Sequence, residues 1–163
     1  METELILLVN LALDDLYKNE QYLLNVKANE RNIVSHFSRY FINRLENNDN
    51  FNKYDVDCEY NRDVFNEKKY KEIIYDKKKH RIIPDMIVHQ RGSNSNNILA
   101  IEFKTYFNSN KNGENDKLKL QALTDNDSFY RYRMGLHIKL GKTRDKVNIV
   151  KYINGKKQSQ VIV

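Results

Sequence analysis

The sequence predicts an α/β protein in which helices and strands alternate within one domain. Apolar residues recur at helical spacing in residues 2–18 and again in residues 27–45. Two apolar, β-branched runs within residues 81–105 flank a Gly/Ser/Asn cluster, which is typical of two antiparallel strands joined by a loop. A short helical pattern and an alternating stretch over residues 132–140 follow. Because helical spacing and strand alternation follow one another along the chain, the sequence predicts the α/β class.

Length and composition fit a single globular domain over residues 1–163. The chain is 40% apolar and 31% charged, enough apolar content to bury a core. No apolar run is long enough to cross a membrane, and the N-terminus carries Glu2 and Glu4 instead of the basic region of a signal peptide. Cys58 is the only cysteine, which excludes an internal disulfide and a cysteine-based zinc site. We therefore expect a cytoplasmic protein without a membrane partner.

Two N-terminal helices are expected. Residues 2–18 form the first, part of an N-terminal extension over residues 1–20 whose apolar side packs internally or contacts a second copy in a homodimer. The second runs from about Lys27 to Leu45, with Asn25 or Asn29 as its cap. Its apolar stripe comprises Ile33, Val34, Phe37, Phe41 and Leu45.

Glu30 lies on the inward side of the first turn of the second helix. A carboxylate there is favoured by the helix dipole, which is the simpler explanation. The alternative is that Glu30 contributes an acid to a metal site.

A half-exposed strand and a basic segment come next. Residues 53–60 alternate, with Asp55, Asp57 and Glu59 on one face, and either of the last two is a candidate accessory acid. Residues 61–79 are rich in lysine. The basic residues nearest the following strand are Lys77, Lys78, Lys79 and Arg81. They form either a solvated loop or a surface that holds a phosphate backbone.

The pair of strands within residues 81–105 carries the most specific pattern. Pro84-Asp85 opens the first strand, where the missing N–H of proline costs least. In the second strand Glu102 and Lys104 share a face and lie about 6.6 Å apart along the strand. Charges in an otherwise apolar strand are costly unless they are paired, solvated or bound to a ligand. The simpler explanation is a Glu–Lys pair on a solvated face; the functional one is a centre in which Asp85 and Glu102 hold Mg²⁺.

The rest of the chain supplies one more helix and two more strands. Asp116 is expected to cap a helix from Lys117 to about Thr124, after a polar loop that includes Gly113. Lys117 and Gln121 lie one turn apart on it. Strands are expected over residues 132–140 and 147–153, and residues 161–163 form a last short strand or a frayed tail.

Pro84-Asp85, a spacer with a hairpin loop, and Glu102-Phe103-Lys104 together resemble the PD-(D/E)XK nuclease superfamily. Glu30-Arg31-Asn32-Ile33-Val34 is similar to the first motif of one branch, the archaeal Holliday-junction resolvases. The resemblance implies a restriction-endonuclease-like fold: an α-β-β-β-α-β core over about residues 29–140, with a central mixed sheet flanked by helices and an extra N-terminal helix.

The same resemblance implies site residues and a cofactor. Asp85, Glu102 and the carbonyl of Phe103, with Glu30, would hold Mg²⁺ or Mn²⁺, and Lys104 would position the attacking water. Gln121 and Lys117 are candidates for contact with the scissile phosphate.

We expect a metal-dependent endonuclease that hydrolyses phosphodiester bonds of nucleic acid, with DNA favoured over RNA. The net charge of +6 supports a polyanionic partner. One alternative is a non-catalytic nucleic-acid-binding domain that retains the fold. Another is a nuclease controlled by a partner protein, docked through the N-terminal helix.

Overall fold

The computed structural model describes the backbone of residues 1–60, 62–63, 66–70, 72–75, 78–81, 83–108 and 113–161. It describes side chains in residues 1–60, 83–108 and 113–158. The candidate residue Lys77 lies outside the described residues, and the side chains of Lys78, Lys79 and Arg81 lie outside the described side chains.

A six-stranded mixed sheet forms the centre of the protein, in the order β1-β6-β7-β8-β9-β10. Its strands are β1 (Asp55–Cys58), β6 (Met86–His89), β7 (Leu99–Thr105), β8 (Met134–Leu140), β9 (Asn148–Ile153) and β10 (Lys156–Val161). Strands β7 and β8 run parallel, and every other neighbouring pair is antiparallel. The expected antiparallel pairing of the strand after Pro84-Asp85 with the Glu102 strand is confirmed, and β6 also pairs antiparallel with β1.

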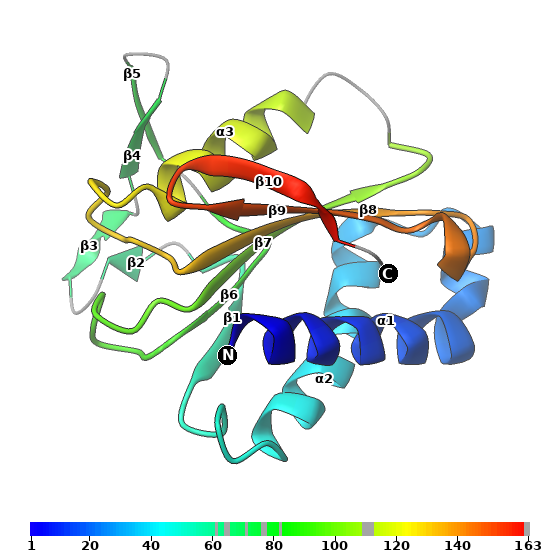
Figure 1. Ribbon diagram of the computed structural model, residues 1–163. Coiled ribbons are helices and arrows are strands. Elements are labelled where there is room, and N and C mark those ends of the chain that lie inside the picture. The colour runs from blue at the N-terminus through cyan, green and yellow to red at the C-terminus, as the bar shows by residue number, and fades with distance from the viewer. Residues whose placement is uncertain are drawn as a thin grey trace.

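Helices cover both faces of the sheet (Figure 1). Helices α1 (Glu2–Asn25) and α2 (Glu30–Glu46) lie on one face, and α3 (Gly113–Thr124) lies on the other. A single 3₁₀ turn, η1 (Arg144–Lys146), precedes β9. No helix in the described part of the chain has the length and apolar character that a bilayer span requires.

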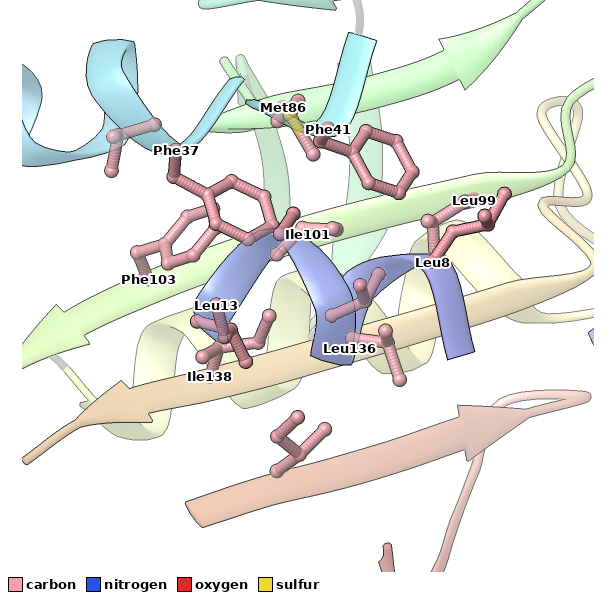
Figure 2. Packing of buried hydrophobic residues seen from close by; sticks show 14 of the residues in the cluster. Leu8, Leu13, Phe37, Phe41, Met86, Leu99, Ile101, Phe103, Leu136 and Ile138 are labelled. Atoms are coloured by element: carbon pink, nitrogen blue, oxygen red, sulfur yellow. The ribbon is translucent and has the colours of Figure 1, made fainter. Parts of the chain in front are cut away.

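The larger core lies between the sheet and the first two helices. The apolar stripe of α2 is buried as predicted, and Phe37 packs edge-on against Phe103 with ring centroids 5.0 Å apart. Figure 2 shows these two rings beside Ile101, with Leu13 of α1 nearby. Residues Leu5, Leu13 and Leu16 of α1 are almost completely buried here. The apolar side of α1 is therefore used within the chain, and a homodimer through this helix would have to use its remaining surface.

A smaller core lies between the sheet and α3. Leu120 and Leu123 of α3 pack with Ile87 and Ala100 of the sheet. Along β7, Leu99, Ile101 and Phe103 therefore face the larger core, as alternation predicts, while Ala100 and Glu102 face α3. The idea that Glu102 lies on a solvated face is wrong, since only 1% of this residue is exposed.

Two hairpins are inserted between β1 and β6. They comprise β2 (Arg62–Asp63) with β3 (Asn66–Tyr70), and β4 (Glu72–Tyr75) with β5 (Lys78–Arg81). Apart from them, α2, β1, β6, β7, α3 and β8 follow the expected order of helix, three strands, helix and strand.

Several boundaries differ from the predicted ones. Helix α1 continues to Asn25 through non-helical angles at Glu20, because Leu24 beyond that point is fully buried. Helix α3 begins at Gly113, so Asp116 lies within the first turn and is not its cap. The last strand begins at Lys156, directly after a turn with positive φ at Asn154 and Gly155.

Candidate active site at the end of strand β7

Asp85 and Glu102 come together just before β6 begins, and Glu102 starts the C-terminal half of β7. Met86 pairs with Ile101, so Asp85, one residue earlier, lies across from Glu102. The N–H of Phe103 donates to Asp85 Oδ2 at 2.7 Å. Because the N–H and C=O of one strand residue point to the same edge, the Phe103 carbonyl is also directed towards Asp85.

Glu102 is a buried carboxylate held by a lysine that the sequence analysis did not single out. Lys119 Nζ of α3 lies 2.7 Å from Glu102 Oε2 and 3.2 Å from Asp116 Oδ1. The other oxygen, Oε1, is buried without a hydrogen-bond partner among the described residues. Burial, reinforced by the charge of Asp85, raises the pKa of Glu102 well above its ordinary value.

Lys104 connects α3 with α2. Its Nζ lies 3.0 Å from Asp116 Oδ2 and 3.5 Å from Glu30 Oε1. Glu30 Oε2 accepts the backbone N–H of Thr105 at 2.9 Å. The helix glutamate suggested by the resolvase-like motif is therefore fixed at the end of β7, in contact with the lysine of the Glu-x-Lys pattern.

The centre contains more acids than bases. Among the described side chains, four carboxylates, those of Glu30, Asp85, Glu102 and Asp116, meet two lysines, 104 and 119, so full ionisation leaves two negative charges without a described cationic partner. Burial raises the pKa of Asp85 to about 6, against the lowering effect of the Phe103 N–H and Lys119. A divalent cation would neutralise this excess.

The donor set fits Mg²⁺ in composition. Asp85 and Glu102 supply hard oxygen atoms, and the unpartnered Oε1 of Glu102 is the atom that most needs a cation or a proton. Within the described residues, no three His, Cys, Asp or Glu side chains form a group that would enclose a metal ion. A metal here would rest on two carboxylates, and the remaining ligands would come from water and substrate oxygens.

A cavity of about 590 Å³ opens beside this centre on the side of α2. Asp85 and Glu30 line it together with Arg31 and Glu59, which form an ion pair at 2.7 Å. Its volume falls in the range of small-molecule sites. Of the two candidate accessory acids, Glu59 thus borders the cavity, whereas Asp57 is bound to His89 and Arg91.

The two α3 candidates lie apart from the carboxylates. Gln121 is two residues beyond Lys119, about 200° further around the helix, and it lines neither of the two cavities described here. Lys117 pairs with Glu114 and lines a second cavity. The residues of α3 that reach the centre are instead Asp116 and Lys119. Their spacing of three residues, in register with Leu120 and Leu123, is the signal that could have identified them.

No family model, curated protein or solved structure matches the chain.

Proposed function

We propose that the protein is a metal-dependent nuclease of the PD-(D/E)XK type, with the restriction-endonuclease-like fold, that hydrolyses phosphodiester bonds of nucleic acid and prefers DNA. The observation that carries this proposal is the excess of buried carboxylate at the end of β7. Asp85 and Glu102 are adjacent, one Glu102 oxygen has no hydrogen-bond partner among the residues that the structure describes, and an accessible cavity borders Asp85.

We assign the residue roles on the basis of their contacts. Asp85 and Glu102, with the Phe103 carbonyl, would hold Mg²⁺ or Mn²⁺, which when bound would supply polarisation of the phosphate and a lower pKa for a water molecule. The N–H of Phe103 fixes Asp85 in position. Lys104, held between Asp116 and Glu30, orients the water or stabilises negative charge on the phosphate.

Lys119 is the ion-pair partner of Glu102 in this structure. Its ammonium supplies one positive charge to two acids, Glu102 and Asp116, and so limits the cost of burying them. Lys119 would keep Asp116 as a partner if a cation were bound to Glu102. The site therefore has two lysines with different positions. Lys119 offsets the charge of the buried acids, and Lys104 lies near the C-terminal end of β7.

Cleavage of plasmid DNA, single-stranded DNA and RNA with Mg²⁺ or Mn²⁺ tests the proposal. We expect Lys104→Ala and Asp85→Asn to lower the cleavage rate by about 10²-fold or more, because each removes a group acting at the phosphate or the metal. Lys142→Ala, at an exposed lysine just after β8 that lines neither cavity, is the matched control and should cleave like the unaltered protein.

Calorimetric titration with Mn²⁺ separates the alternatives. Metal binding that is lost in Asp85→Asn, without cleavage of any substrate, would favour a nuclease that needs a partner protein. Salt-sensitive nucleic-acid binding with neither metal binding nor cleavage would overturn the proposal in favour of a binding domain.

A further inference from the structure

A second cavity, of about 390 Å³, lies on the α3 face of the sheet and shares Lys104 with the candidate active site. Four lysines line it: Lys104 of β7, Lys117 of α3, Lys139 of β8 and Lys157 of β10. Glu114 is the one carboxylate among its described lining residues, and it is paired with Lys117. The cavity is therefore basic, in contrast to the acidic centre next to it.

Strand register places two of these lysines side by side. Lys104 and Lys139 are direct partners in the parallel β7–β8 pair. Like charges at such positions destabilise a sheet unless they are countered. Lys104 is countered by Asp116 and Glu30, but among the described residues no carboxylate lies within 4.0 Å of the ammonium of Lys139 or Lys157. A bound anion would supply the missing charge.

A buried histidine points to the same conclusion independently. His137 is the β8 partner of Glu102, lines this cavity and is only 7% exposed. Its Nε2 atom is buried without a hydrogen-bond partner in the described part of the chain. A buried polar nitrogen without a partner is costly, and an anion oxygen in the cavity would accept its hydrogen. Asn148, the β9 partner of Lys139, adds an amide donor to the lining.

We propose that this cavity binds one phosphate group, with His137, Lys139 and Lys157 as its contacts, next to the acidic centre. The identification of the ligand as a phosphate of the nucleic acid rests on the proposed nuclease function. Two sources share that chemistry: a backbone phosphate neighbouring the one cleaved, and a terminal phosphate on the end of a strand. A subsite of this kind would fix the distance between the cut and either the next phosphate or the strand end.

Titration with inorganic phosphate, followed by the NMR signals of the His137 ring, tests the proposal without divalent metal. The test variant is Lys139→Gln/Lys157→Gln. The control is Lys142→Gln/Lys156→Gln, which removes the same charge from exposed positions that do not line the cavity. We expect the test variant to weaken phosphate binding about tenfold or more and the control to change it less than about twofold. Equal weakening in both variants, or a His137 ring that does not respond to phosphate, would overturn the proposal.

Oligonucleotides with and without a terminal phosphate then identify the source. If the subsite takes a strand end, the phosphorylated strand binds more tightly and the test variant loses only that difference. If it takes a backbone phosphate, both strands bind alike and the test variant weakens both. Phosphate binding with neither metal binding nor cleavage would leave this inference standing while the nuclease proposal fails, and cleavage with no phosphate binding would do the reverse.

Discussion

At the scale of single residues, the buried carboxylates around the C-terminal half of β7 lower the stability of the fold. Glu102 is buried beside Asp85, and among the described side chains two lysines offset the four acids. Such a cluster is expensive to fold, because each carboxylate loses its hydration. Under the proposed function, a bound divalent cation would offset part of this cost.

Asp85→Asn should make the protein more stable at neutral pH. Burial raises the pKa of Asp85 from 3.8 to about 6, so the folded protein holds this proton more tightly than the unfolded chain does. The stabilisation that comes from this proton is present below about pH 4 and is lost as pH rises to about 6. Asparagine stays neutral and can still accept the Phe103 N–H. We expect a gain of about 1–3 kcal/mol at pH 7.5 in urea unfolding.

The control for this substitution is Asp49→Asn, in an exposed turn, which should leave the unfolding free energy unchanged. The gain at Asp85 should shrink at pH 4.5, where the native carboxyl is already protonated. A variant that is no more stable than the unaltered protein at pH 7.5 would show that Asp85 is better solvated than its burial indicates.

Lys119→Met should be destabilising through Glu102. It leaves a carboxylate that is 1% exposed without its ammonium partner, which typically costs about 3–5 kcal/mol. Adding Glu102→Gln removes the charge and should restore part of the loss. A double-mutant cycle measured by urea unfolding at pH 8 should therefore give a coupling of more than about 1 kcal/mol. Additive effects would mean that the 2.7 Å contact between Lys119 and Glu102 contributes little.

At the scale of elements, α3 brings Lys119 to the site because it packs closely on β8. The close approach occurs at Gly135, where an added Cβ would lie 3.1 Å from Thr124 Cγ2 and 3.2 Å from Leu120 Cδ2. The side chain of Thr124 cannot easily move away, because its hydroxyl donates to the Leu120 carbonyl and only 1% of the residue is exposed.

Gly135→Ala should therefore push α3 away from the sheet. We expect a loss of about 1–2 kcal/mol in unfolding free energy, typical of overpacking, and weaker metal binding because Asp116 and Lys119 move with the helix. Gly113→Ala is the matched control at the start of the same helix. Its Cβ meets nothing within 4 Å, and alanine favours the helix, so stability should stay the same or rise by up to about 1 kcal/mol. Equal effects of the two substitutions would contradict a close contact at Gly135.

Periodicity in the sequence was sufficient for the elements with a strong apolar pattern. The apolar stripe of α2 and the alternation in β7 and β8 predicted correctly which side of each element is buried. The two strand predictions around Asp85 and Glu102 also placed these residues next to each other. The start of α3 was missed because Gly113 and Asp116 are residue types typical of a loop and a cap. Lys119 was missed because its partner, Glu102, is 17 residues earlier, and only the packing of α3 on the sheet brings the two together.

At the scale of the whole molecule, a basic protein surrounds an acidic centre. The chain carries 28 lysines and arginines against 22 acids, yet the end of β7 holds an excess of carboxylate. A positive surface attracts a polyanion and raises the rate at which it is captured. The acidic centre would repel the same phosphates unless a divalent cation were present. Capture and cleavage are thus expected to respond differently to salt and metal.

The basic segment before β6 provides the test at this scale. If Lys77, Lys78 and Lys79 each neutralise a phosphate, replacing all three with glutamine should lower the slope of log affinity against log salt by about 2.7 on duplex DNA, at roughly 0.9 per contact. Replacing Lys18, Lys142 and Lys156, three exposed lysines elsewhere, changes net charge equally and should reduce the slope far less. The measurement is fluorescence anisotropy with a labelled duplex between about 50 and 200 mM salt, without divalent metal. Over this range of salt, a change of about 2.7 in the slope produces a large difference in affinity. Equal reductions would show that overall charge attracts the DNA, and that these three lysines belong to a solvated surface.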